Sequence, residues 1–361
     1  MLYFVVTSYI FRKSRIDELR EIAEFRIINS FNNLFVIDTD EGFISKLANH
    51  RPVFVYSAFP IMVSMPIRKE KYIESIEEAA LRTNPEPGKR IMAECFDVNS
   101  KEGYSAKDIE VRLGRRLESM EFQTDLKNPE AMLYVVLMDM VCYAGYLNVD
   151  KMDKPFLNPE RHYLKMGGRI SRAELKLLEA LDEFQIVSEG IALDLGAAPG
   201  GWSRIIAKRG LKVIAIDKGE LDLESLDKEG VRSMSVSGTS FSCNEIKKLL
   251  DSCDILHIRE SAAEVDPSGM CGVGLLLNDI NTGPKESSEI LKRYVGCLCD
   301  GARVIMTVKC IKKKASTYIR QAEEGLRGQL KVTGVRALPS NRQEVTLYAV
   351  KRHVDIPDTE K

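Results

Sequence analysis

The 361-residue chain has few of the residues from which metal sites and disulfide frameworks are built. Its four histidines stand far apart and its eight cysteines are scattered without a Cys-x-x-Cys pair, so neither a metal site nor a disulfide framework is expected. Uninterrupted apolar runs are too short to cross a bilayer, and the first residues lack a basic leader and a cleavage site. We therefore expect a cytoplasmic protein without a membrane partner, in which residues 2–9 form a first strand.

The chain also lacks a large net charge, because its 52 Lys and Arg residues nearly balance its 53 Asp and Glu residues and leave a formal charge of −1. That average argues weakly against a nucleic-acid partner, since contact with phosphates favours lysine and arginine. The basic residues are nevertheless concentrated in two places. Residues 151–176 hold seven basic and three acidic residues, and residues 301–320 hold six basic residues and none that are acidic. Both runs flank the site predicted below and are candidates for contact with nucleic acid.

The most informative segment is Ala192-Leu-Asp-Leu-Gly-Ala-Ala-Pro-Gly-Gly-Trp-Ser203, an apolar strand that leads through a glycine turn into a helix. A second apolar strand, Val213-Ile-Ala-Ile-Asp217, ends in an acid. Glycines let the backbone approach a ligand closely, and a carboxylate at the end of the next strand can accept hydrogen bonds from both ribose hydroxyls. The two segments together predict a nucleoside-binding crevice.

The spacing within this turn limits the kind of nucleoside. It reads Gly-x-x-x-Gly-Gly, which differs from the Gly-x-Gly-x-x-Gly of dinucleotide sites, and Pro199 stiffens the place where a pyrophosphate would lie. A cofactor with a ribose and no phosphate fits better. S-adenosylmethionine is the common cofactor of that kind.

The length suggests two or three domains, and the part before the crevice divides into two α+β units. Residues 1–63 alternate strand and helix, which is typical of a ferredoxin-like unit. Its expected strands are 2–9, 31–37 and 53–63, with helices over 14–25 and 41–49. The second unit, residues 64–150, is expected to have helices over 70–81 and 105–120 and strands over 90–98, 131–137 and 141–147, with Ser105 as a helix N-cap.

Three segments of the second unit resemble a THUMP domain: Phe96-Asp-Val-Asn99, the stretch from Ser105 to Gly114, and Asp125-Leu-Lys-Asn-Pro-Glu130 before an apolar strand. This resemblance implies a role in gripping structured RNA. The proline-bounded stretch 155–159 is expected to be a linker into a third domain, residues 151–361.

The segment from Leu193 to Ser203 resembles the first motif of the FtsJ-type RNA 2'-O-ribose methyltransferases. That family uses a Lys-Asp-Lys-Glu catalytic set, and all four members occur here in order. Their segments are Ser171-Arg-Ala-Glu-Leu-Lys176, Gly274-Leu-Leu-Leu-Asn-Asp279, Arg303-Val-Ile-Met-Thr-Val-Lys309 and Ser340-Asn-Arg-Gln-Glu344. The resemblance implies a Rossmann-like α/β sheet of seven mostly parallel strands, S-adenosylmethionine as cofactor and RNA as substrate.

The chemistry of the set explains its residue types. A ribose hydroxyl is a very weak acid, so a lysine can remove its proton only if the pKa of that lysine is lowered. We expect the second lysine and partial burial to lower this pKa, and the two carboxylates to hold the side chains and moderate the effect.

The cofactor set is completed by a residue that contacts adenine. Two strands, 231–236 and 255–258, compete for the third position of the sheet, and Arg259-Glu260 after the second one resembles the family's pattern. The expected cofactor-binding residues are Asp194, Gly196, Ala197, Pro199, Gly200, Gly201, Trp202, Asp217, Glu260 and Asp279.

Several alternatives stay open at this point. Resemblance over nearly the whole chain to family members that modify bacterial large-subunit rRNA favours rRNA as the substrate, with tRNA second because THUMP domains often serve tRNA enzymes. An RNA 5-methylcytosine enzyme would use Cys271 or Cys310 as its nucleophile. An exocyclic-amine methyltransferase is disfavoured because Asn278-Asp-Ile-Asn281 replaces its Asn/Asp-Pro-Pro-aromatic step. An RNA-binding protein that has lost catalysis is the alternative outside the enzymes.

Overall fold

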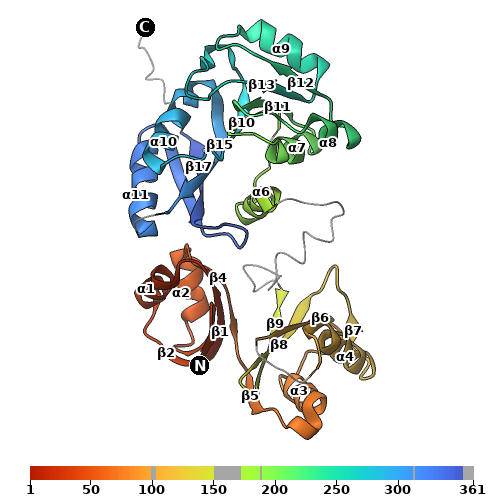
Figure 1. The fold of residues 1–361 in the computed structure, drawn as a ribbon. Helices are drawn as coiled ribbons and strands as arrows, with labels where there is room; N and C mark the ends of the chain where they lie inside the picture. Colours follow the sequence, from red (N-terminus) through yellow and green to blue (C-terminus); the bar gives the residue numbers. More distant parts are fainter. Residues whose placement is uncertain (99–102, 150–171, 188, 312–313, 353–361) are drawn as a thin grey trace, which may run out of the picture. The chain divides into compact units, whose positions relative to one another are not determined.

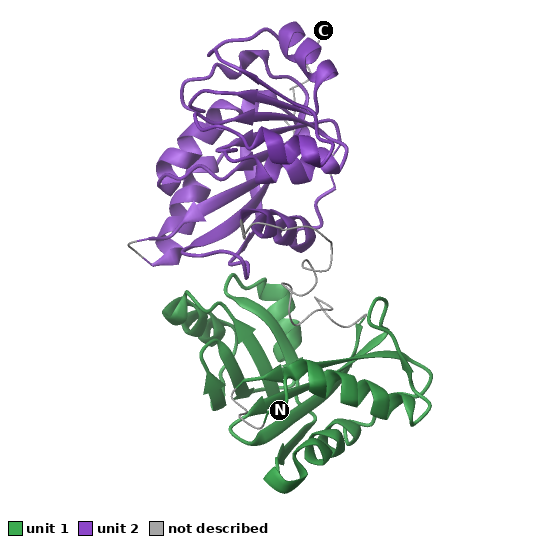
Figure 2. Ribbon diagram, turned by 45° about the vertical axis from the view of Figure 1, so that its right-hand side comes forward, with its two compact units in different colours: residues 1–159 green, residues 160–361 purple. Residues whose placement is uncertain are grey.

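The computed structural model describes residues 1–98, 103–149, 172–187, 189–311 and 314–352. The chain forms two compact units, residues 1–159 and 160–361 (Figure 2). The linker expected at 155–159, the domain boundary at 150 and most of the first basic run lie outside the described residues. No helix within the described ranges is long and apolar enough to cross a membrane.

The N-terminal unit begins with a βαββαβ segment whose four-stranded sheet has the order β2-β3-β1-β4. All three pairs of neighbouring strands are antiparallel, as in a ferredoxin-like arrangement. The two helices lie together beside the sheet (Figure 1). The elements are β1 (Leu2–Thr7), α1 (Arg12–Ile22), β2 (Arg26–Phe31), β3 (Leu34–Asp38), α2 (Phe43–His50) and β4 (Val55–Pro60).

One expectation for this segment is wrong. The single strand predicted over 31–37 is the second half of a hairpin, in which β2 pairs with β3. The turn between them passes through Asn32, whose φ of 53° lies in the left-handed region that asparagine tolerates better than most residues. Strand β2 is almost wholly exposed, so it lacks the apolar alternation by which strands are recognised in a sequence.

The rest of the N-terminal unit is a five-stranded sheet of order β5-β9-β8-β6-β7 with two helices. The N-cap predicted at Ser105 is confirmed, because its hydroxyl accepts a hydrogen bond from the backbone N–H of Asp108 at 3.2 Å. The elements are β5 (Val63–Pro66), α3 (Tyr72–Leu81), β6 (Arg90–Asp97), α4 (Ala106–Glu118), β7 (Gln123–Thr124), β8 (Ala131–Met138) and β9 (Val141–Asn148).

The two sheets of this unit share a hydrophobic core. Phe4 and Phe59 from the first sheet pack in one cluster with Tyr134 and Val136 from the second. The passage from one sheet to the other falls between β4 and β5, close to the boundary expected at residue 63. Because the core is continuous across that boundary, the division into two separate domains stays a prediction.

The C-terminal unit holds a mixed sheet with helices packed on it, as the Rossmann-like prediction requires. Strands β12, β13, β11, β10, β14 and β15 run parallel in that order, and β17 pairs antiparallel with both β15 and β16. The elements are α6 (Arg172–Glu183), β10 (Ile191–Leu195), α7 (Gly201–Lys208), β11 (Lys212–Ile216), α8 (Leu223–Lys228), β12 (Ser233–Val236), α9 (Cys243–Ser252), β13 (Ile255–Ile258), β14 (Val273–Asn278), α10 (Pro284–Arg293), β15 (Leu298–Lys309), α11 (Ala315–Leu326), β16 (Leu330–Arg336) and β17 (Glu344–Lys351).

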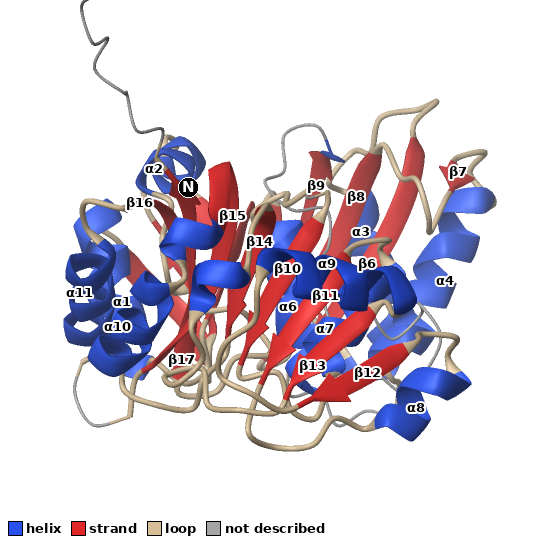
Figure 3. Cartoon of the chain, turned by 90° about the horizontal axis from the view of Figure 1, so that it is seen from above, coloured by secondary structure: helices blue, strands red, loops and turns tan. Residues whose placement is uncertain are grey.

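The expected strand number is corrected from seven to eight within the described residues. Strand β13 lies between β11 and β12, and the succession from β14 to β12 across the sheet is visible in Figure 3. This placement decides between the two strands that competed for the third position. Strand β13 is the direct neighbour of β11, and β12 lies outside it at the edge.

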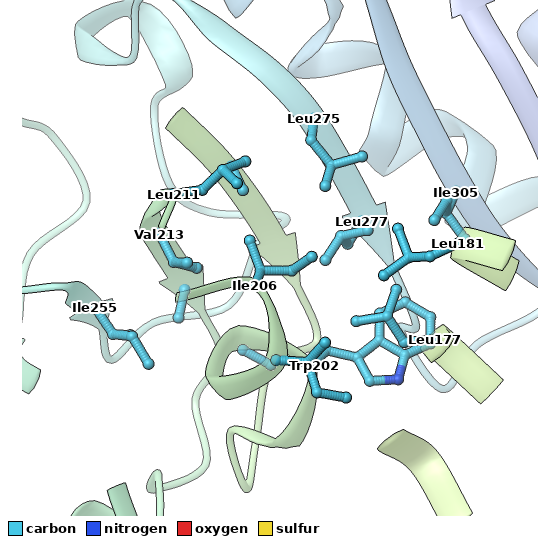
Figure 4. Packing of buried hydrophobic residues seen from close by; sticks show 14 of the residues in the cluster. Leu177, Leu181, Trp202, Ile206, Leu211, Val213, Ile255, Leu275, Leu277 and Ile305 are labelled. Carbon is cyan, nitrogen blue, oxygen red and sulfur yellow. The ribbon is translucent and has the colours of Figure 1, made fainter. Parts of the chain in front are cut away.

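Period-two alternation in the strands builds the core on one face of this sheet. Val213 and Ala215 of β11 and Leu275 and Leu277 of β14 belong to one hydrophobic cluster with Ile206 and Trp202 of α7. Figure 4 shows Ile206 between Val213 and Trp202, and Leu177 beside the indole. The helices contribute apolar residues at helical spacing, among them Leu177 and Leu181 of α6. Asp194 has the same parity in β10 as buried Ala192, so it also lies on this face.

Candidate active site

Three strand ends and one helix bring the four predicted catalytic residues together. Lys309 ends β15 and Glu344 begins β17, and these two residues are direct cross-strand partners. Asp279 follows β14, the other neighbour of β15, while Lys176 reaches the same place from α6. The carboxyl ends of parallel strands meet at one edge of a sheet, which explains why residues up to 168 positions apart form one cluster.

The four side chains form a closed ring of ion pairs. Lys176 Nζ lies 2.9 Å from Asp279 Oδ2 and 3.1 Å from Glu344 Oε1. Lys309 Nζ lies 3.2 Å from Asp279 Oδ1 and 2.7 Å from Glu344 Oε2. Each carboxylate therefore places one oxygen on each lysine, so a displacement of any one member changes two contacts.

The electrostatics of the ring correct one expectation. Burial lowers the pKa of Lys309, but the carboxylates of Asp279 and Glu344 together outweigh it and raise this pKa above its ordinary value. A lowered pKa would require burial and the second lysine to outweigh the two carboxylates, which they do not. In the ring as described, Lys309 is a protonated lysine at neutral pH.

The predicted glycine turn adjoins the ring. Gly196 follows β10 with a φ of +84°, and a Cβ there would lie only 2.9 Å from the backbone nitrogen of Ile280. The backbone N–H of Asp279 donates to the carbonyl of Leu195 at 3.0 Å. Only a glycine fits this close approach, so the turn and the loop that carries Asp279 are held against each other.

Asp217, which follows β11, contacts the same turn. Its Oδ2 accepts a hydrogen bond from the backbone N–H of Ala198 at 3.1 Å, and its Oδ1 accepts one from Gly219 at 2.7 Å. Each carboxylate oxygen has a second lone pair, so both can still accept from the hydroxyls of a ribose. This geometry fits the role predicted for the acid that follows β11.

For Gly200, Gly201 and Trp202, the structure gives reasons other than a close approach to a ligand. A Cβ on Gly200 would point toward the side chain of Leu221 at 3.6 Å, so this glycine is needed for its φ of +107°. A Cβ on Gly201 would lie 2.9 Å from Glu174 of α6. The buried indole of Trp202 donates from Nε1 to the carbonyl of Ala173 at 2.6 Å, so the side chain docks α6 on α7. Contacts of these residues with a cofactor remain predictions.

Asp194 is buried with one oxygen unpaired. Its Oδ2 accepts from Ser203 Oγ at 2.7 Å, whereas its Oδ1 has no hydrogen-bond partner in the described part of the chain. Burial raises the pKa of Asp194 to about 7, so its contribution to stability is present at low pH and is lost as the pH rises toward that value. A cationic ligand beside the turn would offset this loss, and a sulfonium cofactor with a ribose supplies both the charge and the hydroxyls that these residues fit.

The adenine-contacting candidate, Glu260, follows β13 and is half-buried beside the end of β11. Sequence reasoning missed a neighbour of this place, His257. Its Nε2 lies 3.1 Å from the carbonyl of Asp217 and its Nδ1 lies 2.9 Å from Ser235 Oγ. Burial lowers the pKa of His257, which favours the neutral ring that donates to one partner and accepts from the other.

Cys310 and Cys271, the candidate nucleophiles of a 5-methylcytosine enzyme, are poorly placed for that role. Cys310 adjoins the ring in sequence, but it is buried and burial raises the pKa of its thiol to about 12. Cys271 precedes β14 and therefore lies at the end of the strand opposite Asp279. All eight cysteines are free thiols. Within the described ranges, no group of three or more His, Cys, Asp or Glu side chains is arranged to hold a metal ion.

A mostly parallel sheet with a glycine turn after its first strand, an acid after the second and a Lys-Asp-Lys-Glu ring at the strand ends defines a Rossmann-like methyltransferase domain with S-adenosylmethionine as its cofactor. Residues 169–335 match the family of FtsJ-like methyltransferases. This match lies within the C-terminal unit, residues 160–361.

Relatives extend the similarity into the N-terminal unit. "Ribosomal RNA large subunit methyltransferase M" of Cellvibrio japonicus is 26% identical over 94% of this chain and 96% of its own length. The protein of the same name from Pasteurella multocida is 23% identical over 82% of this chain and 80% of its own length. "Uncharacterized protein MJ1257" of Methanocaldococcus jannaschii is 27% identical over 39% of this chain and 34% of its own length.

Cofactor binding can be tested at Asp217. Asp217→Ala removes the ribose acceptor and the hydrogen bond that it accepts from Ala198 of the turn, so the affinity for S-adenosylmethionine should fall about tenfold or more. Titration calorimetry measures this change. The matched control is Glu220→Ala, which removes a nearby exposed carboxylate paired with Arg259 at 3.0 Å and should leave the affinity within about twofold. An unchanged affinity in Asp217→Ala would mean that the crevice is misassigned.

Proposed function

We propose that this protein transfers a methyl group from S-adenosylmethionine to the 2'-hydroxyl of a ribose in RNA, with large-subunit rRNA as the preferred substrate. The observation that carries the proposal is the closed ring of two lysines and two carboxylates against the glycine turn. A hydroxyl group that enters this place meets two lysine amines and two carboxylates, of which Lys309 can serve as a base once it has lost its proton, whereas an attack on a cytosine ring would need a reactive thiol.

The cofactor would be held by Asp217 through its ribose, by the backbone of the turn at Gly196 and by Asp194, with Glu260 at the adenine. When bound, it supplies an electrophilic methyl group on a positively charged sulfur. The residues of the ring orient the ribose hydroxyl and receive its proton. Lys309, once deprotonated, is the base, while Asp279 and Glu344 hold its amine and Lys176 keeps both carboxylates in place.

The preference for rRNA is supported by the relatives named for large-subunit rRNA methylation, whose similarity covers both units of this chain. An RNA-gripping role for residues 64–150 is the matching proposal for the N-terminal unit. The names of these relatives also support the cytoplasm as the proposed place of action.

Mapping of ribose methylation in cellular RNA tests the proposal. RNA from cells with and without the gene is hydrolysed in alkali, in which a 2'-O-methylated linkage survives because its internal nucleophile is blocked. One protected linkage should disappear from the large-subunit rRNA when the gene is deleted. Loss of a protected linkage in tRNA would move the substrate to tRNA, and an unchanged ribose map would overturn the proposal.

The division of labour between the units gives a second prediction. Deletion of residues 1–150 should leave a folded domain, because the C-terminal unit has its own hydrophobic core. Its affinity for S-adenosylmethionine should match that of the full chain, while its methylation of native RNA should fall at least roughly tenfold through lost phosphate contacts. Calorimetry and methyl-transfer assays at one salt concentration measure the two effects. Full activity of the truncated chain would show that the N-terminal unit does not supply RNA affinity.

A further inference from the structure

A buried carboxylate outside the ring joins the two elements that carry Lys176 and Glu344. Glu179 lies three residues after Lys176, about one turn further along α6, and is 4% exposed. Its Oε2 accepts from the backbone N–H of Ser340 at 2.9 Å, and its Oε1 accepts from the Ser340 hydroxyl at 2.7 Å. Both bonds are buried, and they connect residues 161 positions apart.

Ser340 belongs to a turn that leads directly into Glu344. The next residue, Asn341, donates from its backbone N–H to Leu338 at 3.0 Å and from Nδ2 to Thr346 Oγ1 of β17 at 3.2 Å. The carbonyl of Gln343 accepts from the backbone N–H of Cys310 at 2.7 Å. The turn therefore connects Ser340 to the start of β17, where Glu344 pairs with Lys309.

The other half of α6 is fixed on α7. Trp202 holds Ala173 through its indole N–H, and Arg204 donates from Nε to Glu174 Oε1 at 2.8 Å. Lys176 lies between this attachment and the bonds of Glu179. Two independent attachments, one on each side of Lys176, place its amine relative to both the cofactor turn and Glu344.

From this geometry we infer that Glu179 and Ser340 are positioning residues for methyl transfer, which fix the Lys176-to-Glu344 side of the ring. The inference rests on the proposed function of the ring. Neither residue is part of the ring or of the predicted cofactor set, so their effect is expected on the rate of methyl transfer and not on cofactor affinity. The two buried bonds from Ser340 to the Glu179 carboxylate require that turn and α6 to meet in a single register.

Ser340→Ala tests the inference most gently. It removes the hydroxyl donor and keeps the backbone N–H bond, so the fold should remain intact. The single-turnover rate of methyl transfer to RNA from cells that lack the gene should fall about tenfold, and the affinity for S-adenosylmethionine should not change. Glu179→Gln, which keeps the size of the side chain and loses its charge, should give a fall of the same kind.

Combination with Lys176→Ala separates positioning from a merely structural role. If Ser340 acts through Lys176, Ser340→Ala should change the rate by less than about twofold in the Lys176→Ala background. Equal losses in both backgrounds would overturn the inference. An unchanged rate in Lys176→Ala alone would instead show that the ring is not the site of methyl transfer. That result would contradict the proposed function, and it differs from the result that contradicts this inference.

The matched control is another contact of α6, the ion pair between Glu183 of α6 and Arg336 of β16. Arg336 Nε contacts Glu183 Oε1 at 2.8 Å, and Glu183 is seven residues beyond Lys176 at the end of α6. Arg336→Ala should lower thermal stability and leave the rate of methyl transfer close to that of the wild type. A loss of rate as large as that of Ser340→Ala would mean that any loosening of α6 suffices, and would contradict a specific role for Glu179 and Ser340.

Discussion

Replacement of Lys309 by alanine should lower the rate of methyl transfer at least about a hundredfold, which is the scale of the loss of a general base. The change removes the amine that lies 3.2 Å from Asp279 and 2.7 Å from Glu344. Lys309→Met keeps most of the buried stem and should lose the same activity, so a folding defect cannot account for the result. Single-turnover assays with labelled S-adenosylmethionine measure the rate.

The adjacent residue supplies the control. Cys310→Ala should stay close to the wild-type rate, because a buried thiol with a pKa near 12 is protonated at the assay pH. Cys271→Ala should do the same, since Cys271 lies at the far end of β14 from Asp279. Two outcomes would contradict ribose methylation and favour a cysteine nucleophile. One is that the cysteine variants are inactive while Lys309→Ala is active, and the other is a product whose modified linkage is cleaved normally in alkali.

The members of the ring were predicted from the resemblance of their segments to the Lys-Asp-Lys-Glu set of a known family, and strand geometry explains why three of them meet. Each of Asp279, Lys309 and Glu344 is a charged residue at the end or start of an apolar strand, and such ends collect at one edge of a sheet. Lys176 was assigned from its motif on an amphipathic helix. Their order along the chain was visible, and the structure shows that they also meet in space.

What the sequence could not give depends on contacts between distant segments. Nothing local marks the bonds between Glu179 and Ser340, because each residue alone looks like an ordinary helix or turn residue. The choice between the strands 231–236 and 255–258 as the neighbour of β11 was also left open, since a short apolar strand does not reveal its neighbours. The direction of the Lys309 pKa shift required the actual distances to two carboxylates, because burial and ion pairing act with opposite sign.

That raised pKa leads to the second large effect, a steep dependence of the rate on pH. Below its pKa, the deprotonated fraction of Lys309 rises about tenfold for each pH unit, so the single-turnover rate should rise roughly a hundredfold between pH 7 and pH 9. A plateau is not expected in that range, because the ordinary lysine pKa of 10.5 is raised further by Asp279 and Glu344. Rates measured at saturating cofactor and RNA across this range test the prediction.

Stability does not obscure the measurement. A lysine whose pKa is raised in the folded state stabilises the fold fully below its unfolded value of 10.5, and that stabilisation is lost only as the pH rises through the folded value. Glu344→Gln provides the directional check, because removal of one carboxylate should lower the pKa of Lys309 and move the rise in rate to lower pH. A rate that is independent of pH in the wild type, or a shift to higher pH in Glu344→Gln, would show that the proton is not removed by Lys309.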